Sequence, residues 1–179
     1  MIDLALSRPG DAAVLPVGAY GVRRVRLSLQ DIATIDPRLA RVHSDWTQRR
    51  KAGGLPGWSG ADLEDLRPSV DRLQVVEPVE ARPHAGRFQS VIDVLGEQSH
   101  YDPYSGFMDL SLDCPTADSS IRGLIEDYTN VVFFGTPALH RIEVATDTAN
   151  RRFHRLILPL AADGRRVSLL QVCLNAAQD

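Results

Sequence analysis

The feature that most limits the fold of this chain is a pair of apolar runs near its C-terminus, at residues 151–161 and 167–174. Between them stands the dipeptide Asp163-Gly164, which favours a chain reversal between antiparallel strands because both residues tolerate positive φ. In the second run, both faces of an extended chain would be apolar. We therefore expect an antiparallel sheet whose last strand is central and covered on both sides.

The remaining sequence supplies further strands and a separate set of helices. Alternation of apolar and polar residues predicts strands at residues 73–80, 87–98 and 139–146 in addition to the C-terminal pair. Helical spacing of apolar residues predicts helices over 38–52, a short stretch after Ser59, and 119–134. Because helices and strands are segregated along the chain, the fold class is α+β and not a parallel doubly wound sheet.

The length of 179 residues indicates one domain with extensions. Residues 1–35 are expected to form an N-terminal extension with an edge strand at 22–29, where Arg24 and Arg26 alternate with apolar residues. Residues 36–179 form the domain, with a helical lead over 36–68 and a core over 69–175.

The arginines of this extension allow two interpretations. They can form a basic patch for nucleic acid, together with residues of the first helix; the set is Arg23, Arg24, Arg26, Arg49, Arg50 and Lys51. Alternatively they form the solvated face of an edge strand, where positive charge discourages edge pairing. The net charge of −3 favours the second interpretation and argues against nucleic acid as a partner.

Location is indicated only by what the sequence lacks. No apolar stretch approaches the roughly 20 residues of a membrane helix, and the first residues do not read as a secretory signal. Cys114 and Cys173 lie far apart without a CxxC spacing, so we expect two free thiols. These features predict a cytoplasmic protein with no membrane partner.

Several short motifs carry a resemblance to a known family. They are Trp46 and Arg50, Leu55-Pro56, Arg155, Leu158-Pro159-Leu160, and Asp163-Gly164 followed by Val167. In this order they resemble the single-domain bacterial PAS-like proteins over roughly residues 38–175. The resemblance implies a five-stranded antiparallel sheet in the order 2-1-5-4-3, flanked by helices and preceded here by an N-terminal helical extension. It also implies a long helix before the third strand and a small pocket between helices and sheet.

No nucleophile, phosphate-loop or zinc signature appears, so we expect no catalytic residues and no metal. The residues expected to line a ligand pocket are Tyr128, Val132, His140, Ile142, Leu158 and Leu170. His140 is either an axial ligand or pH sensor, or an ordinary strand histidine. Helix 119–134 contains no histidine, and Cys114 lies outside the flavin photosensor motif, so haem and flavin are unsupported and the cofactor is unknown. Glu126 and Asp127 are expected on a solvated helix face.

These observations predict a non-catalytic PAS-like sensory or regulatory module. It would act in trans on a signalling-protein partner, gated by a small-molecule ligand. The alternative is a small-molecule-binding or enzymatic α+β pocket protein with a paired histidine and carboxylate, drawn from His100, Asp102 and His140. The last strand needs cover on both faces, and the second cover is the N-terminal segment, a second subunit or both. We expect a homodimer through Leu39, Val42 and Trp46 of the first helix.

Overall fold

The computed structural model describes residues 21–50, 53–58, 61–78, 88–95, 119–145 and 150–177. Six strands within these residues form one sheet: β1 (Gly21–Leu27), β2 (Arg72–Pro78), β3 (Phe88–Leu95), β4 (Ala138–Ala145), β5 (Asn150–Leu160) and β6 (Leu169–Ala176). Their order is β1-β4-β5-β6-β2-β3, and every neighbouring pair is antiparallel. The α+β class is confirmed, and β6 lies between β5 and β2 as the sequence predicted.

The predicted number of five strands is wrong for the described residues, because β1 joins the same sheet. It pairs with β4 along its whole length, from Gly21 opposite Ala145 to Leu27 opposite Leu139. The segment expected as an edge strand of an extension is therefore the edge of the main sheet. Without β1, the remaining strands lie in the order β3-β2-β6-β5-β4.

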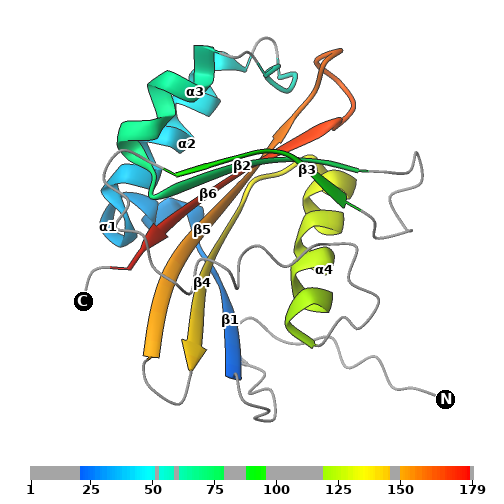
Figure 1. The fold of residues 1–179 in the computed structure, drawn as a ribbon. Helices are drawn as coiled ribbons and strands as arrows, with labels where there is room; N and C mark the ends of the chain where they lie inside the picture. Colours follow the sequence, from blue (N-terminus) through cyan, green and yellow to red (C-terminus); the bar gives the residue numbers. More distant parts are fainter. Residues whose placement is uncertain are drawn as a thin grey trace, which may run out of the picture.

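Helices lie on both sides of this sheet. They are α1 (Ile32–Ile35), α2 (Pro37–Arg49), α3 (Ala61–Leu66) and α4 (Ser119–Phe134). Figure 1 shows α1, α2 and α3 on one side of the sheet and α4 on the other. The Asp36 carboxylate starts α2 by accepting hydrogen bonds from the backbone N–H groups of Arg38 (3.0 Å) and Leu39 (3.1 Å), with Pro37 in the first turn.

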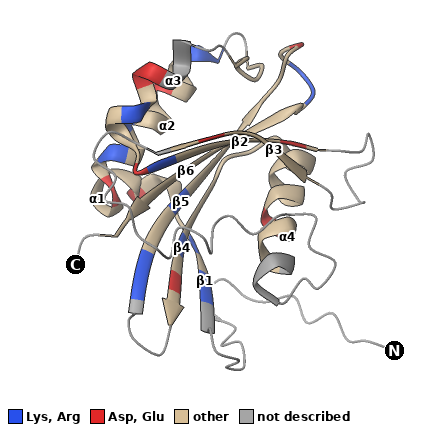
Figure 2. Cartoon of the chain, viewed as in Figure 1, with Lys and Arg blue, Asp and Glu red and all other residues tan. Residues whose placement is uncertain are grey.

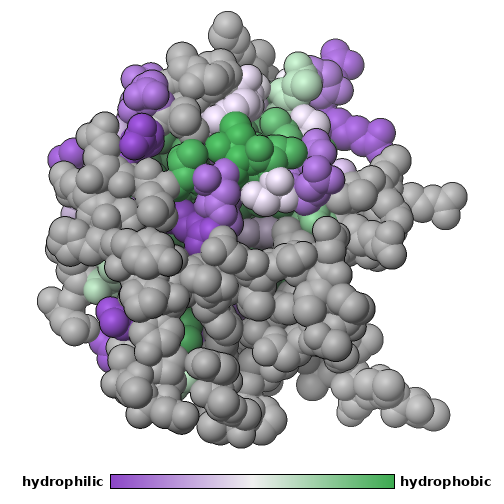
Figure 3. Space-filling model, in the orientation of Figure 1, coloured by the Kyte–Doolittle hydropathy of each residue, from purple (hydrophilic) through white to green (hydrophobic). Residues whose placement is uncertain are grey.

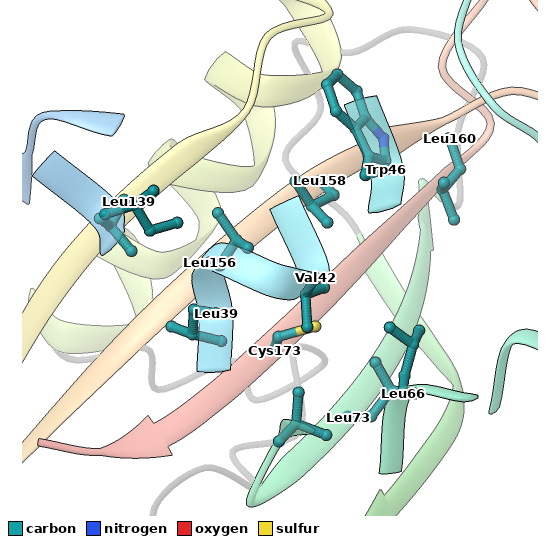
Figure 4. Packing of buried hydrophobic residues seen from close by; sticks show 12 residues of the cluster. Leu39, Val42, Trp46, Leu66, Leu73, Leu139, Leu156, Leu158, Leu160 and Cys173 are labelled. Carbon is teal, nitrogen blue, oxygen red and sulfur yellow. The ribbon is translucent and has the colours of Figure 1, made fainter. Parts of the chain in front are cut away.

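The core beneath α2 contains the three residues expected at a dimer interface. Leu39, Val42 and Trp46 are almost completely buried, and Figure 4 shows them pointing at side chains of the sheet from the same chain. The Trp46 indole N–H also donates to the carbonyl oxygen of Pro159 at 2.9 Å. These side chains are buried within one chain. The expectation that they form a dimer interface is therefore wrong.

A second core lies beneath α4. Tyr128 and Val131 of this helix pack against Ile157, Leu170 and neighbouring side chains of the sheet. The Phe88 ring of β3 contacts the Tyr128 ring edge to face, with centroids 5.3 Å apart. Helices of the same chain thus cover both faces of β6, so the need for cover no longer argues for a second subunit.

Apart from Arg155, which lies within β5, the motifs that carry the family resemblance lie together near the connection from β5 to β6. The connection from β5 to β6 spans residues 161–168 and contains Gly164 at φ 72°, a conformation that glycine adopts without strain. The backbone N–H of Leu55 donates to the carbonyl of Gly164 at 2.8 Å, and that of Ala161 to the carbonyl of Pro56 at 3.0 Å. The loop that follows α2 is therefore anchored on the hairpin.

Large exposed apolar side chains among the described residues are Val91 of β3 and Phe133 and Phe134 of α4. On the side seen in Figure 3, hydrophobic residues gather near the position of β2 and β3, with hydrophilic residues around them. No helix in the described part of the chain is long and apolar enough to cross a membrane.

Candidate functional site

The buried surface between α4 and the sheet carries charged side chains beside its apolar ones. Asp127 precedes Tyr128 on α4 and faces the sheet with it; only 8% of its side chain is exposed. Its neighbour Glu126 is 67% exposed. The expectation that both carboxylates lie on a solvated face is confirmed for Glu126 and wrong for Asp127.

The sheet presents a row of residues to this helix. His140 of β4 lies directly opposite Arg155 of β5, and Arg155 lies opposite Leu174 of β6. Residues paired across strands share a face of the sheet, so His140 and Arg155 are neighbours beneath α4. Both side chains are about 4% exposed.

The Asp127 carboxylate joins these two residues and a third from β1. Its Oδ2 forms an ion pair with Nη2 of Arg155. Its Oδ1 lies 3.3 Å from Nε2 of His140, and Oδ2 lies 3.3 Å from Nη1 of Arg24. We call Arg24, Asp127, His140 and Arg155 the α4 cluster.

Arg24 ties β1 to α4. Its Nη1 donates to the carbonyl oxygen of Gly123, and its Nη2 lies 3.1 Å from Oε2 of Glu126. A side chain at Gly123 would require this guanidinium to move. Arg24 is therefore an anchor between edge strand and helix.

The other arginine of β1 with a charged partner lies on the opposite face of the sheet. Arg23 is 3.2 Å from Glu143 of β4, and Arg152 of β5 is 3.9 Å from the same carboxylate. Figure 2 shows these basic positions on β1 and β5 on either side of the acidic one. Arg23 and Arg24 thus pair with carboxylates on different faces, which weakens the interpretation of one continuous basic patch.

Burial sets the protonation states in the α4 cluster. Burial lowers the pKa of His140, and the charges of Arg155 and Arg24 add to this, although Asp127 opposes them. Burial alone raises the pKa of Asp127, but His140 and the two arginines outweigh it and hold that pKa below its usual value. At neutral pH the cluster therefore contains a carboxylate, two guanidinium groups and a neutral imidazole.

The neutral imidazole has a defined tautomer. Since Nε2 of His140 faces a carboxylate, it carries the proton, and Nδ1 is left with a lone pair. Nδ1 of His140 and Nε of Arg155 are buried and have no hydrogen-bond partner in the part of the chain that the structure describes. Buried polar groups are rarely left unpaired, so these two atoms, which belong to residues paired across β4 and β5, need an explanation.

Tyr128 and a second ion pair border the cluster. The Arg155 guanidinium lies 6.0 Å from the centroid of the Tyr128 ring. Burial raises the pKa of the Tyr128 phenol to about 12, so it stays protonated. Further along the sheet, Arg72 contacts Asp93 through Nε at 2.8 Å, and the Gln74 amide donates to the same carboxylate at 3.2 Å.

A second buried polar network lies on the α2 side of the sheet, and its contacts anchor the start of α2. The Asp36 carboxylate, besides capping α2, accepts from the Asn175 amide at 3.3 Å and lies 3.4 Å from Nδ1 of His154. Asn175 in turn accepts from the backbone N–H of Asp71 at 2.8 Å. These contacts fix the start of α2 to β5 and to the end of β6, which is a structural role.

The residues expected to line a pocket divide between the two faces. Tyr128 and Leu170 belong to the core beneath α4, Val132 packs against it, and His140 and Ile142 share one face of β4. Leu158 lies in the core beneath α2, as Figure 4 shows, because residues two apart on a strand share a face and Leu158 alternates with Ile157. Including Leu158 in that site was wrong.

The alternative interpretation required a histidine paired with a carboxylate, and His140 with Asp127 is such a pair. His100 and Asp102 lie outside the described residues, as does Cys114. Within the described residues no three His, Cys, Asp or Glu side chains are grouped as a metal site. Cys173 is buried on the α2 side, where burial raises its pKa to about 12, so it is a thiol and not a nucleophile.

No protein-family model, curated protein or solved structure matches this chain.

Proposed function

We propose that this chain is a PAS-like, non-catalytic sensory or regulatory module that acts on a protein partner. The observation that carries the proposal is the strand order β3-β2-β6-β5-β4. Numbered along the chain without β1, this is 2-1-5-4-3, the order expected from the family resemblance. The 16-residue helix α4 precedes β4, the third strand in that numbering.

The contacts of the motif residues support the same proposal. Trp46 of α2 donates to Pro159, and Arg50 lies 5.1 Å from the Trp46 ring. Leu55 and Pro56 bond to the hairpin that contains Asp163 and Gly164. Motifs that lie far apart in the sequence thus form one connected structural unit, which supports the proposal that they belong to one PAS-like fold.

The position of α4 suggests how sensing would reach a partner. On its buried side the helix carries Asp127, which holds the α4 cluster together. At its C-terminal end Phe133 and Phe134 are 60% and 64% exposed, with their rings 4.9 Å apart. Exposed aromatic pairs are typical of protein contacts. A ligand that rearranged the cluster would move α4 and therefore this aromatic surface.

Site-specific photocrosslinking in the native host tests this proposal. A photoreactive residue at Phe134 should crosslink to a partner, and the Asp127→Asn substitution should change that yield. The control is the same probe at Arg151, an exposed position at the far end of β5, where no such dependence is expected. Equal crosslinking at both positions, or a Phe134 yield that Asp127→Asn does not alter, would refute the proposal.

The His140–Asp127 pair favours one alternative, an enzyme in which the carboxylate orients His140 as a general base. That alternative predicts that His140→Gln abolishes turnover of a substrate. The sensory proposal instead predicts that this variant alters ligand affinity or partner contact. It predicts no turnover of a substrate in the wild-type chain.

A further inference from the structure

The α4 cluster carries one net positive charge as it stands. Arg24 and Arg155 supply two positive charges, Asp127 supplies one negative charge, and His140 is neutral. Outside the cluster, Glu126 pairs with Arg24 but is mostly exposed to solvent. The cluster can therefore accept an anion, because a buried charge needs an opposite charge and hydrogen-bond donors nearby.

Two polar atoms of the cluster remain unpaired, and they lie on cross-strand partners. Nε of Arg155 is a donor, whereas Nδ1 of His140 is an acceptor while the ring is neutral and becomes a donor once it is protonated. With His140 protonated, the two atoms would present two N–H groups from adjacent strands. Two such donors suit the two oxygens of one carboxylate.

We propose that the α4 cluster binds a small monocarboxylic acid and that His140 takes up one proton when it binds. The carboxylate enters from solution as an anion, and a solvent proton adds to Nδ1 of His140, so the net charge of the cluster does not change. Arg155 Nε–H and His140 Nδ1–H then donate to the carboxylate, and Asp127 keeps its contacts to Nη2 and Nε2. This deepens the proposed sensory function by naming the ligand class for the same site.

The surroundings favour an acid with an apolar body. On the same face of the sheet, the row next to His140 and Arg155 is Ile142 and Phe153 on one side and Ala138 and Ile157 on the other. Tyr128 and Val131 of α4 add apolar surface nearby. On β4 and β5 the polar row therefore runs between apolar residues, and Arg24 of β1 continues the row of Ile142. This fits a carboxylate head with a hydrocarbon or aromatic substituent and not inorganic phosphate.

The charged groups that face His140 set the pH dependence. They are Asp127 from α4, Arg155 from β5, and Arg24 and Arg26 from β1, with Arg26 opposite His140 in the register but exposed. Three of these four groups are cations that resist protonation of the ring in the absence of an added anion. The negative charge of the bound carboxylate would instead favour protonation of the His140 ring.

Isothermal titration calorimetry on the full chain tests the proposal with acetate, butyrate and benzoate as probes, and with benzamide and inorganic phosphate as comparators. Buffers with different ionisation enthalpies count the protons taken up. We expect one acid to bind with uptake of one proton. Its affinity should fall up to tenfold per pH unit from the pKa of His140 in the free protein, which lies below the ordinary value of about 6.5, up to the pKa of His140 in the complex. No binding by any acid, or binding without proton uptake, would overturn the proposal.

Two substitutions locate the site. Arg155→Lys keeps the positive charge beside Asp127 but removes the Nε donor, and should weaken binding about tenfold or more, as loss of a charge-assisted hydrogen bond does. Arg152→Lys, on the opposite face of β5, is the matched control and should bind as wild type does. His140→Gln should bind weakly with no proton uptake. Equal affinities for the two lysine variants would refute the assignment.

Two outcomes separate this inference from the proposed function. If an acid binds with proton uptake but leaves the Phe134 crosslinking unchanged, the ligand assignment stands and the sensory role fails. If crosslinking responds to Asp127→Asn but no acid binds, the sensory role stands and the ligand assignment fails. If circular dichroism shows that a variant does not fold, the number of protons that the wild-type chain takes up on binding still tests the ligand assignment.

Discussion

Among single residues, Asp127 holds the most contacts in the α4 cluster, since its carboxylate pairs with Arg24, His140 and Arg155. We predict that Asp127→Asn lowers the free energy of unfolding by about 3–5 kcal/mol, because it leaves the Arg155 charge buried without a counter-charge. Glu126→Gln is the matched control one residue away and should cost less than about 1 kcal/mol, as exposed pairs do. Urea denaturation measures both, and equal effects would contradict the assignment.

His140 and Asp127 also predict how stability depends on pH. The pKa of His140 is lowered in the folded state, so the unfolded chain binds its proton first and stability is lost as pH falls below about 6.5. The pKa of Asp127 is lowered as well, so its contribution is lost only as pH falls below about 4. Melting temperatures should therefore fall between about pH 7.5 and 5.5.

His140→Gln should reduce the fall of the melting temperature with decreasing pH. Part of that fall should remain in the variant, because burial also lowers the pKa of His43 on α2. Differential scanning fluorimetry across this range checks the prediction. A slope that is unchanged in the variant would show that His140 is already protonated in the folded chain.

The residues of the site were only partly predictable. His140 and Tyr128 were predicted because they stand on a strand and a helix with clear periodicity. Asp127 was missed because a carboxylate beside Glu126 is normally solvated, although it lies three residues after Leu124 and four before Val131 on the buried stripe. The partners of Arg155 depend on which helix covers its strand, and a local pattern does not determine that.

At the scale of elements, α2 is the helix whose assigned role changed most. We predict that Trp46→Ala destabilises the chain by about 3–5 kcal/mol, since it removes a buried aromatic ring and the hydrogen bond to Pro159. It should not change the state of association, because the ring is buried within one subunit. Denaturation and sedimentation velocity measure the two effects, and a variant that dissociates without losing stability would restore the dimer interface.

The elements themselves were predicted well, and their arrangement less so. Helix 119–134 has the predicted bounds, and the strands agree to within a few residues because alternation of apolar residues is a local property. The apolar faces of the last strand correctly indicated cover on both sides. These apolar faces did not indicate that α2 and α4 provide the cover. An apolar face shows that a surface is buried, but it does not show which element covers it.

At the scale of the whole molecule, β1 belongs to the main sheet and not to a separate extension. Removing residues 1–28 should therefore lower the stability of the chain, because β4 becomes an open edge and Arg24 is lost from α4. Thermal melting measures the loss of stability, and size-exclusion chromatography detects association through the new edge. An unchanged melting temperature would show that residues 29–179 fold without β1.

The central claim is that the α4 cluster controls how α4 is held against the sheet. Hydrogen–deuterium exchange of the full chain, comparing Asp127→Asn with Glu126→Gln, tests it most directly. We predict that amides of α4 exchange faster in Asp127→Asn, while those of α2, on the other face, keep the rates seen in Glu126→Gln. Exchange in α4 that is unchanged, or that rises equally in α2, would contradict the account.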